Sequence, residues 1–320
     1  MGIAMFEYFW KQQDDIPAGM GYPLFGVAHL LSVAITLFFV VILARWILGL
    51  GAAKRRPGDG LDAAKRRPRG GSEASAELRG VGPEVARRRR IIRGIPLFMV
   101  GLEVFKDLFL VHVGRFGIGY LPLHICSIGI FVFLFREWGA LGMAQSSRES
   151  VSGGHAAMAK SSRESEPGGH AMLQRMKDVF GEIAFILIMP ASFTALLFAD
   201  WTVYYPVLNF MNIYSYIWHG LLILYPVTLW LGGEIKPSIR HIHYVLLFLC
   251  VVVLPIYAFD KHFGCNYFFV NWPVPDSPLS WLASFMGNPG YLVGYAFLTL
   301  AVILLMYFGV WAIGGKDSSL

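Results

Sequence analysis

Basic residues in this 320-residue chain are concentrated in every second gap between seven apolar segments. In chain order, the apolar segments cover residues 23–50, 91–113, 121–135, 183–199, 214–231, 244–259 and 291–313. An α-helix needs about 20 apolar residues to cross the ~30 Å hydrocarbon core of a bilayer, and somewhat fewer where the bilayer thins. The pattern therefore predicts an all-α bundle of seven transmembrane helices.

The same charge pattern predicts the orientation of the bundle. Of the 27 Lys and Arg residues, 21 lie in the gaps 51–90, 136–182 and 232–243 and in the tail after residue 313. The N-terminal stretch and the other three gaps contain only Lys11, Arg115 and Lys261. Because Lys and Arg are retained on the cytoplasmic side, we expect a multi-pass cell-membrane protein with its N-terminus outside and its C-terminus in the cytoplasm.

Composition narrows the choice of partners. The chain is 56% hydrophobic and 15% charged, which exceeds what a soluble core of this size tolerates. The net charge of +6 is concentrated in the predicted cytoplasmic loops, where it orients helices and contacts anionic lipid. No folded basic domain is predicted that could form a nucleic-acid groove. We therefore expect membrane lipids as partners and no nucleic acid, and the sequence does not give the oligomeric state.

Two cytoplasmic gaps contain internal duplications. The sequence Ala-Ala-Lys-Arg-Arg-Pro at 52–57 recurs at 63–68, and Ser-Ser-Arg-Glu-Ser at 146–150 recurs at 161–165. Segments composed of Gly, Ser, Pro and charged residues cannot bury a core. We expect a single membrane domain over residues 1–320 with disordered insertions at about 51–90 and 138–177.

Several ionisable residues lie at one depth in the predicted bundle. Such groups are expensive inside a bilayer and mark functional sites. Counting ~1.5 Å per residue from the outer end of each helix places His29, Lys106, Asp107 and His219 roughly 8–10 Å deep and His124 roughly 5 Å deep. We therefore expect them to converge on an outward-facing polar site in the outer half of the bundle.

Three chemistries fit this set. A histidine oriented by Asp107 could act as a general base in lipid acyl chemistry, the same groups could bind a transition metal, or they could relay protons. Metal binding ranks last because no helix contains His-x-x-x-His or Glu-x-x-His, so no metal site or cofactor is predicted. A purely structural reading also stays open, because Glu103, Lys106 and Asp107 share one helix face and could form an internal ion pair.

Several sequence landmarks resemble one family of membrane proteins. They are Leu-Pro-Leu-His-Ile-Cys-Ser at 121–127, Trp-His-Gly at 218–220, Gly-Cys-Asn-Tyr-Phe at 264–268, Gly-Asn-Pro-Gly-Tyr at 287–291 and Phe-Gly-Val-Ala-His-Leu at 25–30. Taken in chain order, these segments resemble those of the YwaF-like conserved integral membrane proteins of bacteria. The resemblance covers nearly all seven helices and omits the two insertions.

That resemblance implies a chemistry. The family is distantly similar to eukaryotic multi-pass lipid acyltransferase-like proteins and, more remotely, to lipid-ester hydrolases. The resemblance implies that His124 and His219 are site residues and that Asn266 and Tyr267 are loop residues that close over the site. In the acyltransferase-like relatives a cysteine stands beside the helix-three histidine. Here Leu123 precedes His124, and on a helix Cys126 would point about 200° away from that histidine.

The sequence thus favours lipid acyl transfer or lipid-ester hydrolysis. His124 or His219 would take a proton from the attacking hydroxyl or water, and Asp107 would orient the imidazole. Lys106, Asn266 or Tyr267 would stabilise the oxyanion, and His29 would complete the substrate-binding set. The alternative is a proton-coupled small-solute transporter or a solute-binding membrane protein, with a scaffold third. The sequence does not decide between enzyme and carrier.

Overall fold

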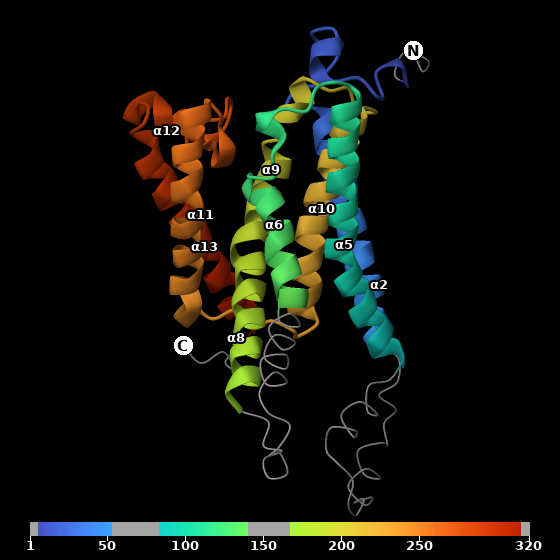
Figure 1. Cartoon of the computed structure of the whole chain (residues 1–320), viewed down its shortest axis with the longest axis vertical. Helices are drawn as coiled ribbons and strands as arrows, with labels where there is room; N and C mark the ends of the chain where they lie inside the picture. Colours follow the sequence, from blue (N-terminus) through green and yellow to red (C-terminus); the bar gives the residue numbers. More distant parts are fainter. Residues whose placement is uncertain (1–5, 53–82, 140–166, 315–320) are drawn as a thin grey trace, which may run out of the picture.

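The computed structural model describes residues 6–52, 83–139 and 167–314, and these residues form an all-α protein. Its helices run side by side for most of their length (Figure 1). They are α2 (Val27–Ala52), α5 (Pro83–His112), α6 (Ile125–Leu134), α8 (Pro167–Ile183), α9 (Met189–Leu197), α10 (Phe210–Leu231), α11 (Ile242–Phe263), α12 (Pro278–Met286) and α13 (Tyr291–Gly314). The all-α prediction is confirmed.

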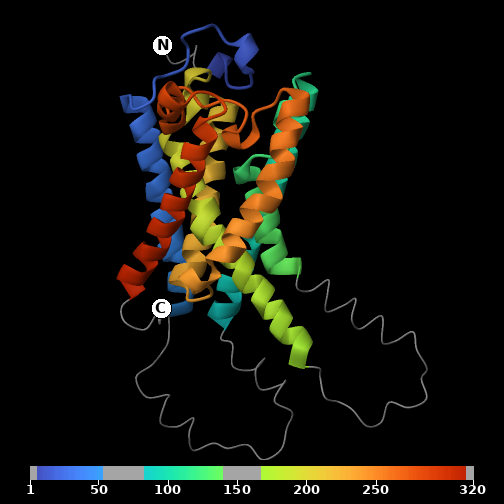
Figure 2. The same ribbon diagram turned by 90° about the vertical axis from the view of Figure 1, so that its left-hand side faces the viewer.

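The helices alternate in direction, so each end of the bundle gathers distant parts of the sequence (Figure 2). We call the end that carries the N-terminal segment the upper end, as in Figure 1. There α2, α6, α10 and α13 begin, and α5, α9 and α11 end. At the lower end α2, α10 and α13 finish, and α5, α8 and α11 begin.

Four helical stretches are long and apolar enough to cross a membrane, namely 27–49, 172–203, 239–263 and 291–313. The protein is therefore a multi-pass membrane protein. The helices α5, α6 and α10 do not belong to this group. Charged residues interrupt α5, α6 has only ten residues, and α10 is rich in Tyr, Trp and His. The seven-span count and the orientation stay predictions.

Two elements form the centre of the bundle. The first is α10, and the second is the continuous rod of α8, a π-helical turn (Ala184–Ile188) and α9. All residues from 181 to 188 are buried. The helix α2 packs on this centre with Val33, Val40, Ala44 and Ile47, which lie on one face because of their spacing. In α11 and α13 only 11% of the apolar stretch is buried, so these helices offer wide apolar surfaces suited to lipid.

A hydrogen-bonded strap holds the N-terminal segment over the upper end. Asn209 caps α10 through its Oδ1 atom, which accepts from the backbone N–H of Met211 at 2.8 Å. Its Nδ2 atom donates to the carbonyl oxygens of Tyr8 (2.7 Å) and Lys11 (2.9 Å). Trp10 packs against the rings of Phe109 and Phe210. One asparagine thus starts α10 and fixes the segment that covers it.

The predicted insertions are shorter than expected. The helix α5 already begins at Pro83 and α8 at Pro167, so residues 83–90 and 167–177 are helical where the sequence predicted disorder. These residues are mostly polar, and they are helical as extensions of helices that pack in the bundle. The duplicated Lys-Arg-Arg-Pro and Ser-Ser-Arg-Glu-Ser units lie outside the described residues.

Replacing Asn209 tests the strap. We expect Asn209→Ala to cost about 2–3 kcal/mol, because it removes a helix cap and two hydrogen bonds. For a chain of this size that lowers the thermal midpoint by roughly 5–10 °C. Asn209→Asp keeps the capping oxygen and loses the two donor bonds, so its thermal midpoint should lie about midway between those of the wild type and Asn209→Ala. Thermal unfolding in detergent measures both, and an unchanged midpoint for Asn209→Ala would contradict the analysis.

Candidate active site

His219 lies in the upper half of α10 and is 8% exposed. Its Nδ1 atom is 2.7 Å from the carbonyl oxygen of Ser215. A carbonyl oxygen only accepts, so Nδ1 carries the proton and Nε2 keeps its lone pair. Trp201, in a 3₁₀ turn (Asp200–Val203), stacks on the imidazole with ring centroids 5.2 Å apart and an interplanar angle of 5°. The ring is therefore held in one place and in the tautomer that can accept a proton at Nε2.

His124 caps the start of α6 in an extended conformation, with φ −67° and ψ 151°. Its ring packs against the rings of Tyr267 (4.8 Å) and Phe269 (5.6 Å). Across the described residues, no hydrogen-bond partner is present for its ring nitrogens. His219 and Lys106 lie close enough to act on it electrostatically. His124 at the start of α6, His219 on α10 and Lys106 on α5 thus come from three different elements.

Lys106 lies in a buried cluster of charges on α5. Its Nζ atom is 2.7 Å from Oε1 of Glu103 and 3.1 Å from Oδ1 of Asp107. The hydroxyl of Tyr214, on α10, donates to the other carboxylate oxygen of Glu103. The two ion pairs lie within α5, and the Tyr214 hydrogen bond joins α5 to α10.

Asp107 does not orient an imidazole, contrary to the sequence-based expectation. Its side-chain contact is with Lys106, and no hydrogen bond joins it to a histidine in the described part of the chain. The residue follows Lys106 directly, so its carboxylate reaches the neighbouring ammonium first. Glu103, which the sequence placed on the same face, makes the contact across to α10.

His29 is fully buried and has both ring nitrogens occupied. Nδ1 accepts from the backbone N–H of Phe25 at 3.0 Å, and Nε2 lies 2.9 Å from the carbonyl oxygen of Leu196. The ring therefore ties the start of α2 to the end of α9. It was expected to bind substrate, but this geometry leaves no ring nitrogen for a ligand.

Asn266 organises its own loop. Its Oδ1 atom accepts from the backbone N–H groups of Asn271 (3.1 Å) and Trp272 (3.0 Å), and its Nδ2 atom donates to the carbonyl oxygen of Trp272. These bonds close the turn that follows α11. They occupy the groups that were expected to contact substrate.

Tyr267 is buried and contacts His124 through its ring. Burial raises the pKa of its phenol to about 12, so the hydroxyl stays neutral and donates to the carbonyl oxygen of Ile118. The next two residues, Phe268 and Phe269, have φ values of 54° and 56°. Positive φ values favour glycine, so the backbone of this turn is strained. The turn places the rings of Tyr267 and Phe269 against His124.

Sequence reasoning missed Trp201 and misplaced Cys126. Nothing in the sequence singled out Trp201 beyond its position at the end of an apolar segment. Cys126 is partly buried on α6 beside Ser192. The expected 200° separation from His124 does not apply, because His124 is not in a helical conformation. The three cysteines are free, so Cys126 and Cys265 form no disulfide.

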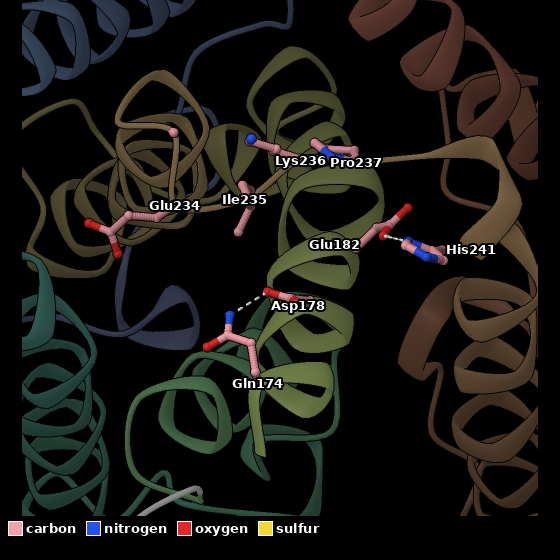
Figure 3. Close-up of a pocket in the computed structure, with 9 residues that line it drawn as sticks. Gln174, Asp178, Glu182, Glu234, Ile235, Lys236, Pro237 and His241 are labelled. Carbon is pink, nitrogen blue, oxygen red and sulfur yellow. Dashed lines mark hydrogen bonds and ion pairs between the residues drawn. The ribbon is translucent and has the colours of Figure 1, made fainter. Parts of the chain in front are cut away.

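A cavity of about 270 Å³ lies at the lower end, away from the histidines. Glu182 lines it, and Figure 3 shows its contact with His241. It accepts from the backbone N–H of Ser238 (3.0 Å) and the hydroxyl of Tyr307 (2.8 Å), and it lies 2.7 Å from Nδ1 of His241. Within the described residues, no three His, Cys, Asp or Glu side chains gather to hold a metal ion.

Removing one hydroxyl tests the upper charge cluster. Tyr214→Phe leaves a buried carboxylate oxygen of Glu103 without its donor, so we expect a loss of about 1–3 kcal/mol in the free energy of unfolding. The matched control is Tyr216→Phe, whose hydroxyl accepts only a long hydrogen bond of 3.4 Å from Tyr22. Thermal unfolding compares the two variants. Equal midpoints would show that the Glu103 bond contributes nothing.

Comparison with known proteins identifies the family. The model of the TMEM164 family matches residues 24–307, which covers all helices from α2 to most of α13. This match corrects the assignment to the YwaF-like proteins that the sequence landmarks indicated. Comparisons with curated proteins and with solved structures gave no match. The chain is a multi-pass membrane protein of the TMEM164 family.

Proposed function

We propose that this protein transfers an acyl chain between membrane lipids, or hydrolyses a lipid ester, at the histidine site of the upper end. One observation carries the proposal: Nδ1 of His219 donates to the Ser215 carbonyl oxygen at 2.7 Å, which leaves Nε2 as the ring atom that can accept a proton. A general base needs this lone pair and a fixed position beside the proton it accepts. Membrane lipids are the substrates the surroundings favour, because the site lies in an apolar bundle.

His219 is the better candidate for the base. The Ser215 carbonyl fixes its tautomer, and Trp201 fixes its plane. His124 has no such partner among the described residues, and aromatic rings hold it instead. We assign proton acceptance from the attacking hydroxyl or water to His219. His124 then contacts the substrate or returns the proton to the leaving group.

Lys106 supplies the positive charge near the reaction centre. Its ammonium acts on His124 electrostatically, and a developing oxyanion beside that ring would be stabilised. Glu103 and Asp107 hold the Lys106 ammonium in place at 2.7 and 3.1 Å. In this proposal Asp107 acts through Lys106 and is a positioning residue. Tyr267 shapes the site with its ring, and Asn266 and His29 hold the loop and the helix behind it.

Lipid analysis in cells tests the activity. Membranes from cells expressing the wild type, His219→Ala and His124→Ala at equal levels are compared by mass spectrometry. The control is His262→Ala, an exposed histidine at the end of α11. We expect one lipid class to change its acyl chains with the wild type and the control. Loss of a general base lowers such a rate about 10²–10⁴-fold, so both site variants should leave that class unchanged.

The same experiment separates a direct from a covalent route. Cys126→Ala removes the thiol beside the site and leaves both histidines in place. Retained activity would support attack by the lipid hydroxyl or water itself, whereas its loss would point to an acyl-thiol intermediate. If the wild type alters no lipid class although it is folded and inserted, the enzyme proposal fails.

A second candidate is a proton-coupled solute transporter. Buried charges favour it, because Arg136, Glu137 and Glu182 lie at the lower end and the cluster around Lys106 lies at the upper end. Ionisable residues at several depths are the pattern of a proton path. Solute uptake that depends on pH and is lost in His219→Ala would favour this function over lipid chemistry.

The orientation proposal places the upper end outside the cell and the seven segments across the membrane. The charge pattern of the loops supports it. Single cysteines at exposed positions test it in a background with the native cysteines replaced by alanine. Gln13→Cys, at the upper end, should react with a membrane-impermeant maleimide on intact cells, whereas Lys236→Cys, at the lower end, should react only after permeabilisation. The reverse labelling would overturn the orientation.

A further inference from the structure

A second cluster of buried charges lies at the lower end, far from the histidines. It comprises three arginines and two glutamates. The arginines are Arg88 and Arg93 on α5 and Arg136 in the π-helical turn that follows α6, and we call these three the lower arginine cluster. The glutamates are Glu137 and Glu234. The cluster therefore has one positive charge in excess.

Glu137 has all the partners it needs. Its Oε1 atom accepts from Nη1 of Arg136 and from the hydroxyl of Tyr225, and its Oε2 atom lies 3.4 Å from Nε of Arg93. It is buried, and these contacts neutralise it. It therefore has little capacity left for the remaining guanidinium groups.

Glu234 makes only long ion pairs with Arg88 and Arg136. Its two oxygens lie 3.7 Å from Nη2 of Arg88 and 3.7 Å from Nη2 of Arg136. Both distances exceed the length of a hydrogen bond. The Glu234 side chain is 29% exposed, and the residue follows α10 in a loop, so it can move into solvent. A carboxylate thus lies between two arginines without bonding closely to either.

Among the residues that the structure describes, several guanidinium donors of this cluster have no hydrogen-bond acceptor. The Arg136 side chain is 7% exposed, and its buried Nε atom has no hydrogen-bond partner. The Nε and Nη2 atoms of Arg88 are likewise buried without one. Leaving such donors unpaired costs free energy, and a charged acceptor would recover it.

The backbone leaves room for these side chains. A Cβ atom at Gly232 would lie 1.6 Å from Nη2 of Arg88, and one at Gly181 would lie 3.1 Å from Nε of Arg136. Glycine at these two positions allows the guanidinium groups to lie against the end of α10 and against α8. The cavity of the lower end borders the cluster at Glu234 (Figure 3).

We propose that the lower arginine cluster binds a phosphate group, either in the headgroup of an anionic lipid or as free phosphate. Phosphate oxygens would bond the unpaired donors of Arg88 and Arg136 as Glu234 moves out. Arg93, with a side chain 47% exposed, opens the site to the surroundings. Basic pockets between transmembrane helices bind anionic headgroups in this way. The site is separate from the histidines and does not depend on the proposed enzymatic activity.

Thermal shift of the purified full chain in an uncharged detergent tests the site. The probes are dihexanoyl phosphatidylglycerol, dihexanoyl phosphatidylcholine and inorganic phosphate. We expect phosphatidylglycerol to raise the thermal midpoint and Arg88→Gln to weaken its binding about tenfold, since one charge-assisted contact is lost. The control Arg90→Gln removes the same charge from an exposed position on α5 and should change little.

Removing Glu234 should have the opposite effect. Glu234→Gln removes the carboxylate that competes with the phosphate, so binding should become tighter by several-fold, whereas Asp178→Asn, an exposed acid at the same end, should not change it. This arm decides the question if Arg88→Gln does not fold. A response to phosphatidylglycerol alone identifies a lipid headgroup, and a response to inorganic phosphate as well identifies free phosphate. Equal effects of Arg88→Gln and Arg90→Gln, or no tightening in Glu234→Gln, would overturn the proposal.

Discussion

Charges buried in an apolar bundle need partners, because the hydrocarbon around the helices supplies no water to solvate them. In this protein those partners come from other helices or turns. Glu103 and Lys106 on α5 reach Tyr214 on α10, and Arg136 and Glu137 reach α5 and α10 at the opposite end. The apolar faces allow the helices to pack in several ways. The paired charges restrict α5, α6 and α10 to one arrangement and thereby place the histidines.

The upper site owes its geometry to elements that carry no charge. Trp201 and the Ser215 carbonyl fix the ring of His219, and the strained turn at Phe268 and Phe269 fixes that of His124. Catalytic groups held in this way lose little freedom when a substrate binds. The two proposals give the ends of the bundle different tasks: the upper end would support proton transfer to or from a lipid, and the lower end would bind an anion.

Much of the fold could be predicted from the sequence, because hydrophobic length depends on local composition. The helices lie close to the predicted segments, whereas the depths of His124, His219 and Lys106 in a membrane stay predictions. The ends of α5 and α8 could not be predicted, since residues 83–90 and 167–177 are polar and become helical only as extensions of packed helices. The lower arginine cluster was missed because Arg136 and Glu137 stood at the edge of a loop in the sequence.

The sequence by itself determined that this is an apolar, all-α membrane protein, and it predicted histidines from separate segments at a similar depth, because helix length and rise follow from residue counts. Tertiary structure alone decided which groups those residues contact. It paired Asp107 with Lys106 instead of a histidine, gave both nitrogens of His29 to the backbone, and placed Trp201 on His219. Depth is one coordinate, whereas a hydrogen bond also requires the rotation and tilt of each helix, which packing between distant segments sets.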